Sequence, residues 1–293
     1  MPWVYFTILA AMSWAISNLI HKYILSRYTP TPMISTIFMG CLGLVVAIII
    51  FQFTEVFIPP LELLILSLTS GLMYVIAIMF YFKAIMIEEV SRVVPLFSIN
   101  PIFILILATI FLGEIFSFQK YLGIFILAIG SFLISLRKGA KFIISKAFGL
   151  MIIATLFLAV NNILAKYILN SLTYWNTFVW IRIGTFLPIP LLFYINRKQT
   201  IETVSKKPKC GLYLAISQLF NIIALIFSTI ALSYGFVSLV GALGQIQNFI
   251  VLVFATLLSI FKPNIIKEEL KRSTILQKII ATMLILSGAT LIT

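Results

Sequence analysis

The sequence predicts an all-α membrane protein with ten transmembrane helices, arranged as two inverted five-helix repeats. Hydrophobic residues make up 62% of the 293-residue chain, only 10% of the residues are charged, and the mean hydropathy is +1.16. Apolar runs of about 20 residues, the length that crosses a bilayer as a helix, follow one another along the chain. A polar pattern also occurs twice, as Asn18-x-x-x-Lys22-Tyr23-Ile24-Leu25 and as Asn162-x-x-x-Lys166-Tyr167-Ile168-Leu169.

Charges, prolines and turn residues separate the ten expected spans. Each span must be helical, because an isolated strand would leave its backbone groups without hydrogen bonds in lipid. No basic region precedes the first run and no cleavage site follows it, so we interpret it as a retained helix rather than a signal peptide. The spans are expected at residues 3–21, 33–53, 62–82, 90–112, 120–136, 147–167, 175–195, 211–232, 236–261 and 275–292.

Basic residues predict the orientation of the chain, because cytoplasmic loops retain positive charge. Most of the 21 Lys and Arg residues fall in alternate loops that share one side of the membrane. We therefore expect these loops in the cytoplasm and both termini outside, in a multi-pass protein of the plasma (cytoplasmic or inner) membrane. The net charge of +13 does not indicate nucleic acid as a partner, since the basic residues are dispersed over short loops. It fits the lipid bilayer.

The repeated pattern divides the chain into a first repeat, residues 1–140, and a second repeat, residues 141–293, with five expected spans each. Matches continue beyond the octapeptide, for example Ala84 with Ala231 and Ser91 with Ser238. An odd number of crossings inverts the second half relative to the first. This arrangement lets one fold open a central site to either side of the membrane in turn.

Interrupted helices at corresponding positions of the two halves are the best indication of a cargo site in such a fold. The fourth span contains Pro95 and Pro101 and the ninth contains Gly241 and Gly244, so we expect both to break and to act as hinges. Polar side chains beside these breaks are the first candidates for substrate binding: Ser98, Asn100, Gln245, Gln247 and Asn248. The alternative is structural, with prolines that bend a packed helix and amides that bond helices together.

Other polar residues lie on the helices expected to flank the same cavity. Asn18 and Asn162 occupy matching positions in the two halves. Tyr74 matches Asn221, and Gln218 lies one turn before Asn221 on the same helix face. We interpret all five as candidate substrate-binding residues, with a hydrogen bond between helices as the equal alternative for each.

Charged residues inside the spans are few. Arg182 is the one cation well within a span, and it either faces the cavity and pairs with a cargo carboxylate or extends to the outer interface as an anchor. Lys166 lies closer to the outer surface and is read as an anchor. The chain has no Asp, and its eight Glu residues fall at span ends or in loops. An intramembrane carboxylate of the kind that couples protons to cationic drugs is therefore not expected.

The same inventory argues against other classes of protein. His21 is the single histidine, and Cys41 and Cys210 show no metal-binding spacing, so neither a metal nor another cofactor is expected. A membrane-embedded enzyme acting on lipids would need an acid, a base or a metal cluster at membrane depth. A channel would need a continuous polar stripe. The polar residues concentrate instead near the middle of a few helices.

Small residues recur every seven positions in the fifth and tenth expected spans, as Gly123 and Gly130 and as Ala281 and Gly288. Residues seven apart share a helix face, so this pattern predicts close helix packing. The contact is expected within one protomer or between the two protomers of a possible homodimer.

These residues carry a family resemblance. Pro101, then Leu112-Gly113-Glu114, Gln119, Gly123 and Gly130 resemble the end of the repeat in EamA-like transporters of the drug/metabolite transporter superfamily. In the second half, Asn248 stands in place of the proline and Phe261 in place of the glutamate, with Glu268 or Glu269 as a displaced counterpart. Gly241-Ala242-Leu243 is similar to the start of a substrate-contacting motif in nucleotide-sugar carriers, but Gly244 and Gln245 depart from that motif.

The resemblance implies a central cavity between two repeats. We therefore expect a secondary transporter that moves a small polar metabolite by alternating access, exporting an amino acid or related compound, and not an enzyme. The alternative is a multidrug carrier, or a nucleotide-sugar or other metabolite carrier of the same fold; a lipid enzyme or a channel fits less well.

Overall fold

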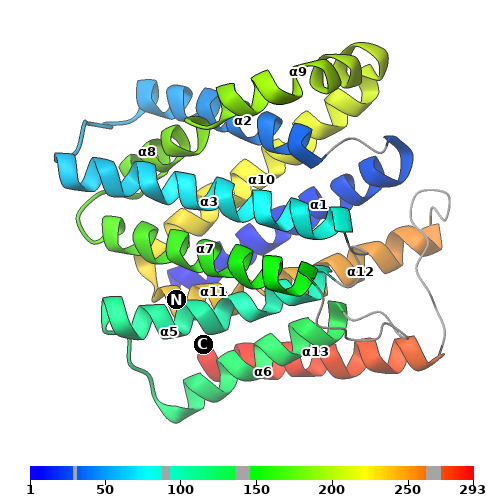
Figure 1. Ribbon diagram of the computed structural model, residues 1–293. Helices are drawn as coiled ribbons and strands as arrows, with labels where there is room; N and C mark the ends of the chain where they lie inside the picture. Colours follow the sequence, from blue (N-terminus) through cyan, green and yellow to red (C-terminus); the bar gives the residue numbers. More distant parts are fainter. Residues whose placement is uncertain (29–31, 88–92, 136–145, 262–271) are drawn as a thin grey trace.

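The computed structural model describes residues 1–28, 32–87, 93–135, 146–261 and 272–293. Every regular element within these ranges is a helix, as the apolar runs predict (Figure 1). The elements are α1 (Pro2–Tyr28), α2 (Pro32–Phe53), α3 (Leu61–Ile87), η1 (Val94–Ile99), α5 (Asn100–Leu112), α6 (Phe118–Ser135), α7 (Lys146–Leu169), α8 (Tyr174–Phe186), α9 (Ile189–Lys206), α10 (Pro208–Tyr234), α11 (Val237–Leu243), α12 (Ile246–Phe261) and α13 (Arg272–Ile292).

The helices are those of an integral, multi-pass membrane protein. By length and composition, the described chain has six helices that suffice to cross a bilayer, or seven if α8 and α9 form one bent span. Three shorter apolar stretches accompany them, Leu96–Leu112, Phe118–Leu133 and Leu276–Ile292. The count of ten crossings therefore stays a prediction.

Two of the expected spans are interrupted near their proline or glycine residues. In the fourth, a 3₁₀ segment, η1, leads into α5, and Pro101 lies in the first turn of α5, where its missing N–H leaves no hydrogen bond unmade. In the ninth, α11 ends at Leu243 and α12 begins at Ile246, so the break falls on Gly244 and Gln245. A 3₁₀ stretch or a short gap inside a span is where a helix bends most easily.

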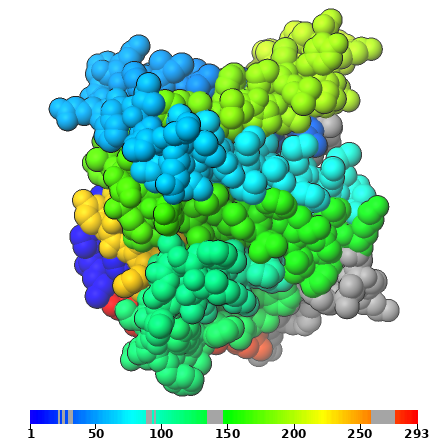
Figure 2. Space-filling model, turned by 60° about the vertical axis from the view of Figure 1, so that its left-hand side comes forward, coloured from blue at the N-terminus to red at the C-terminus, as the bar shows by residue number. Residues whose placement is uncertain are grey.

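The seventh expected span differs from the prediction. Residues 175–195 were expected as one span followed by a basic loop, but the helix breaks at Leu187 and Pro188 with a bend of 50°. It then continues as α9 to Lys206, with a kink at Asn196. Pro188 and Pro190 lack the N–H groups that would join the two pieces into one helix. As a result, α9 stands out from the body of the molecule (Figure 2).

The predicted repeats are interleaved rather than side by side. In the bundle, α1 packs on α10, α3 on α7, α6 on α13, α2 on α8, and α5 on α11 (Figure 1). Each of these pairs joins one helix from residues 1–140 with one from residues 141–293. Both chain termini lie at the end of the bundle that also carries the turns at 54–60, 113–117 and 170–173.

Small residues let α6 and α13 approach closely. A Cβ atom on Gly123 would lie 3.0 Å from the carbonyl oxygen of Gly288, and one on Gly130 would lie 3.0 Å from that of Ala281. The seven-residue pattern of small residues therefore serves packing within one chain.

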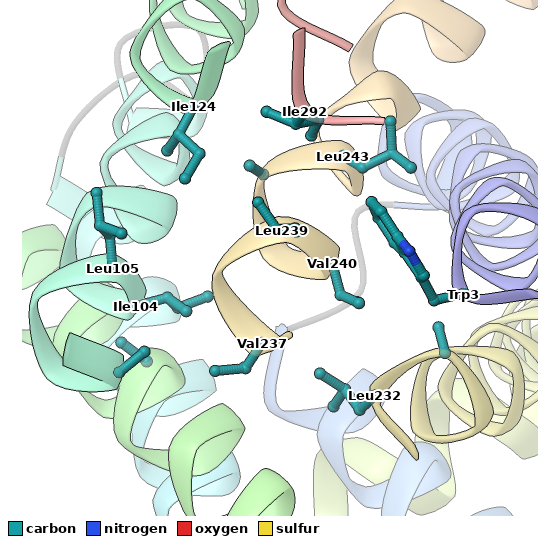
Figure 3. Packing of buried hydrophobic residues seen from close by; sticks show 14 of the residues in the cluster. Trp3, Ile104, Leu105, Ile124, Leu232, Val237, Leu239, Val240, Leu243 and Ile292 are labelled. Atoms are coloured by element: carbon teal, nitrogen blue, oxygen red, sulfur yellow. The ribbon is translucent and has the colours of Figure 1, made fainter. Parts of the chain in front are cut away.

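The short helix α11 lies at the centre of the largest apolar cluster (Figure 3). Its residues Val237, Leu239, Val240 and Leu243 are each no more than 5% exposed. Trp3 from α1 covers one side, and a Cβ atom on Gly235 would lie 2.8 Å from Trp3. Side chains of α5, α6 and α13 cover the rest of the cluster. Helix α11 is therefore held on all sides by apolar contacts.

Candidate functional site

Four polar side chains meet beside the two interrupted helices: Ser98 of η1, Ser131 of α6, Gln245 in the break before α12, and Asn248 in the first turn of α12. We call them the hydroxyl–amide cluster. The Ser131 hydroxyl donates to Gln245 Oε1 at 2.8 Å and accepts from Asn248 Nδ2 at 2.7 Å. Its oxygen also lies 2.7 Å from that of Ser98. Because the single proton of Ser131 is committed to Gln245, Ser98 must be the donor in this last bond.

The cluster brings three predicted site residues together through one that the sequence analysis missed. Ser131 is fully buried and bonds to all three of the others. No spacing singles it out, since the residue that follows Gly288 in the second half, at the matching position, is Ala289. Asn100 is bonded elsewhere, donating to the backbone oxygen of Thr155 on α7 at 2.9 Å.

A second polar group links α1, α3 and α10. Asn221 Oδ1 accepts from Trp14 Nε1 at 3.1 Å, and Asn221 Nδ2 donates to Gln218 Oε1 at 3.3 Å. The Tyr74 hydroxyl lies close enough to the Asn221 side chain to interact with it. Three predicted site residues therefore meet here, with Trp14 as a fourth member.

Tyr74 also contacts Arg182, which is only 4% exposed. The guanidinium carbon lies 5.4 Å from the centre of the Tyr74 ring and 5.6 Å from that of Phe178. Arg182 Nε is buried without a hydrogen-bond partner. Among the described residues, the guanidinium has these two ring contacts and neither a hydrogen bond nor an ion pair. We call Arg182, Tyr74 and Phe178 the arginine site.

Two glycines set the geometry of the arginine site. A Cβ atom on Gly71 would lie 2.3 Å from the carbonyl oxygen of Ile181, and one on Gly184 would lie 2.4 Å from that of Leu68. The backbones of α3 and α8 therefore touch, which places Tyr74 beside Arg182. Arg182 is buried rather than extended toward the interface, and its pairing with a cargo carboxylate stays a prediction.

The remaining predicted site residues stand apart from both groups. Asn18 is exposed on α1. Asn162 donates to Leu158 of its own helix at 2.9 Å. Gln247 is half-buried and makes no side-chain hydrogen bond within the described ranges. Of the predicted hinges, Gly241 packs against Ile104, where a Cβ atom would lie 2.8 Å from a side-chain carbon.

Glu114 lies in the turn after α5, at the end of a span as expected, but its side chain is buried. It is 4% exposed, and its two carboxylate oxygens accept from the backbone N–H groups of Val237 at 2.8 Å and Ser238 at 3.1 Å, at the start of α11. The family resemblance includes Glu114 but gives it no partner. Glu268 and Glu269, its proposed counterparts, lie outside the described residues.

Lys166 has a related role instead of the expected interfacial anchor. Its Nζ donates to the backbone oxygens of Leu232 and Gly235, both at 2.8 Å, at the end of α10. Glu114 and Lys166 together hold the turn between α10 and α11, one through its N–H groups and the other through its carbonyl groups. Free carbonyls at the end of a helix attract a cation, and free N–H groups at its start attract an anion.

Within the described ranges, no three His, Cys, Asp or Glu residues lie together as they would around a metal ion. Cys41 and Cys210 are both free thiols. The polar chemistry of the described interior is therefore that of hydroxyls, amides, one unpaired guanidinium, one capping carboxylate and the ammonium of Lys166 at the end of α10. Such groups bind and release a solute through hydrogen bonds and charge.

The comparisons with known proteins agree with this picture. Residues 1–136 match the family model described as "EamA-like transporter family". A solved structure titled "Crystal structure of protein" is similar with a TM-score of 0.75, over 99% of this chain and 96% of that one, at 15% sequence identity. At that identity the likeness concerns the fold alone. No curated protein matched the chain.

Proposed function

We propose, from the match of residues 1–136 to the EamA-like transporter family, that the protein is a secondary transporter that moves a small polar metabolite by alternating access. The family makes the protein a membrane transporter of the drug/metabolite type, with a small-molecule substrate in the bilayer. An amino acid or related compound, exported from the cell, is our proposed cargo. The cargo would exchange hydrogen bonds with the interior and undergo no chemical change.

The pairing of helices supports the inverted repeat. If α7 is the counterpart of α1 and α10 that of α3, the contact of α1 with α10 has its equivalent in the contact of α3 with α7. Two further pairs, α2 with α8 and α6 with α13, each join a helix to its own counterpart, and the pair of α5 with α11 joins the fourth expected span to the ninth. This is the pattern of contacts that a two-fold axis in the membrane plane generates.

The ten crossings require the shorter helices to span the bilayer as well. Helix α6 has 18 residues and α13 has 21, while η1 and α5 have 6 and 13. Each span is thus close to the roughly 20 residues that a bilayer needs. With ten crossings, both termini lie on one side, and the concentration of Lys and Arg in alternate loops of the sequence supports termini outside the cytoplasmic membrane.

The hydroxyl–amide cluster is the observation that carries the proposal. It joins η1, from the first half, to the start of α12, from the second half, at the two breaks. Hydrogen bonds between uncharged groups exchange readily for bonds to a polar solute, because each contributes only about 1 kcal/mol net. A solute that competes for Gln245 and Asn248 would release one interrupted helix from the other. Such a release is the hinge motion that alternating access needs.

Counterflow in proteoliposomes tests the proposal. Vesicles loaded with unlabelled amino acids should accumulate the same labelled amino acid transiently, and the rate should saturate with concentration. Asn248→Leu should abolish exchange, whereas Thr290→Ala, on the exposed side of α13, serves as the matched control and should exchange normally. Conductance without saturation would indicate a channel, and a chemically altered solute would indicate an enzyme.

Topology is tested separately with single cysteines in a background without Cys41 and Cys210. A cysteine placed at Thr293 should react with a membrane-impermeant maleimide in intact cells. One placed at Gln199, in α9, should react only after the membrane is opened. The reverse pattern would invert the proposed orientation.

A further inference from the structure

We infer that Arg182 is the recognition point for a carboxylate of the cargo, so that the transporter selects monoanionic or zwitterionic carboxylic acids. The inference rests on the proposed transport function and adds the substrate's charged group to it. It follows from the burial of Arg182, its missing counterion and the single positive charge in its surroundings.

No acidic side chain of the described chain neutralises Arg182. The protein has no Asp. Of the described glutamates, Glu55, Glu62 and Glu202 are exposed, and both oxygens of Glu114 are occupied by the start of α11. A guanidinium has five N–H donors, and the ring faces of Tyr74 and Phe178 accept none of them as a hydrogen bond would. The donors are therefore available to a group that the described chain does not supply.

Such a cation is costly within a membrane protein. Buried charges in transmembrane segments are normally paired, and unpaired ones mark a path or a binding site for a charged solute. A neutral long-chain residue would fill the same space between α3 and α8 without this cost. Aromatic walls lower the cost only in part, because they attract the cation without neutralising its charge.

The surroundings select a group with a single negative charge. Lys166 is bound to the carbonyls at the end of α10, and Leu232 lies eleven residues from Asn221, which is about 16 Å along the helix. Within the described interior, Arg182 is thus the one cation near the polar group of Tyr74, Asn221 and Gln218. One guanidinium balances one carboxylate and matches its two oxygens in a bidentate pair. A phosphate dianion would keep an unbalanced charge in the apolar interior.

The inference is tested with the full chain in detergent by comparing the binding of carboxylic acids with the binding of their amides. The thermal unfolding of the purified protein is followed with L-alanine, L-leucine, L-phenylalanine and lactate, each compared with its primary amide. At least one acid should raise the unfolding temperature of the wild type, and its amide should not, because only the acid can pair with the guanidinium.

Arg182→Met should weaken binding of that acid about 30-fold or more, as loss of one partner from a buried charge pair does. Arg182→Lys should bind more weakly than the wild type but better than Arg182→Met, since the charge remains and the two-pronged geometry is lost. Arg197→Met, at an exposed arginine of α9, is the matched control and should bind as the wild type does.

Three outcomes would overturn the inference: no stabilisation by any acid, equal stabilisation by acid and amide, or undiminished binding by Arg182→Met. Failure of the transport proposal would look different. If an acid binds in a manner that depends on Arg182 but no counterflow is seen, the transport proposal is wrong and the carboxylate site stands. If an amine or a neutral solute shows counterflow that Arg182→Met does not alter, the transport proposal stands and the carboxylate site is wrong.

Discussion

The hydroxyl–amide cluster and the arginine site are both buried and polar, yet they differ in how their hydrogen-bonding groups are satisfied. Ser131 uses its donor and accepts two bonds, so Ser98, Gln245 and Asn248 all have partners. Arg182 has rings on its faces and no acceptor among the described residues. A satisfied cluster stabilises the structure in which it is seen. An unpaired buried charge favours the binding of a ligand that supplies the missing acceptor.

This difference separates two roles that sequence reasoning had assigned to one place. We propose that the hydroxyl–amide cluster holds the interrupted helices together until the cargo competes for its amides, while the arginine site receives the carboxylate of the cargo. Substitutions in the two regions should then differ in sign. Loss of a cluster residue should lower the unfolding temperature measured without cargo. Loss of Arg182 should leave that temperature equal or slightly higher and should weaken cargo binding instead. The predictions that follow test this contrast from the largest expected effect to the smallest.

Gly184→Ala should have the largest effect, because it disturbs the frame of the arginine site. The new Cβ atom would lie 2.4 Å from the carbonyl oxygen of Leu68, and a backbone atom cannot move aside as a flexible side chain can. Overpacking of this kind costs about 1 to 3 kcal/mol or more. We expect a lower unfolding temperature and loss of carboxylate binding.

Gly149→Ala is the matched control for this change. A Cβ atom on Gly149 meets nothing within 4 Å, and alanine favours a helix more than glycine does. We expect unchanged or slightly higher stability and normal binding. Equal unfolding temperatures for the two variants would show that α3 and α8 are not in backbone contact at Gly184.

Ser131→Ala tests the satisfied cluster. It removes the shared partner and leaves buried Ser98 and the half-buried amides of Gln245 and Asn248 one bond short, which costs about 1 to 3 kcal/mol. Thermal unfolding without cargo should show the loss. Ser287→Ala, on the exposed face of α13, should stay within about 0.5 kcal/mol of the wild type. A Ser131→Ala protein as stable as Ser287→Ala would refute the structural role of the cluster.

Much of the fold could be predicted from the sequence, because apolar length is a local property. Pro101 and Gly244 also mark their breaks locally, since each changes the backbone where it stands. The break after Phe186 also has a local cause, in Pro188 and Pro190. Both prolines lie within an apolar run, however, and the sequence predicts that run as one span. Hydropathy does not register a bend, so the sequence predicts a straight span where the structure has two helices at an angle of 50°.

The members of the two polar groups could be predicted only in part. Asn221, Gln218 and Tyr74 stand out as polar residues in apolar helices, and they do meet. Ser131 and Glu114 were missed because their partners are far away in sequence, on α12 and α11. A helix that is apolar on all sides has no polar face to show which side is buried. Burial of Glu114 therefore became visible only with the neighbouring helices in place.

Glu114→Gln tests a case between the two regions, because Glu114 is a buried charge like Arg182 but has hydrogen-bond partners like the hydroxyl–amide cluster. Glutamine keeps the shape and one acceptor oxygen but loses the negative charge and the second acceptor at the start of α11. Loss of a charged helix cap costs about 0.5 to 2 kcal/mol. We expect a moderate drop in unfolding temperature, measured beside Glu62→Gln at an exposed position. A drop no larger than that of Glu62→Gln would mean that the carboxylate is not needed to hold α11.

Arg182→Met, measured without cargo, should give the smallest change and the opposite sign to Ser131→Ala. The substitution removes a charge that no described group neutralises and leaves an apolar chain of similar length between Tyr74 and Phe178. Replacing buried charge by apolar side chains is often neutral or stabilising. The lost ring contacts offset this gain by about 0.5 to 2 kcal/mol.

The balance should leave the unfolding temperature of Arg182→Met equal to or slightly above that of the wild type. If Arg182 instead served only to hold α8 against α3, its loss would lower the unfolding temperature by as much as Ser131→Ala does, and the contrast between the two regions would disappear. A stable Arg182→Met protein that no longer distinguishes an acid from its amide would combine the two results. Such a protein would show that the positive charge of Arg182 serves cargo binding and does not stabilise the fold.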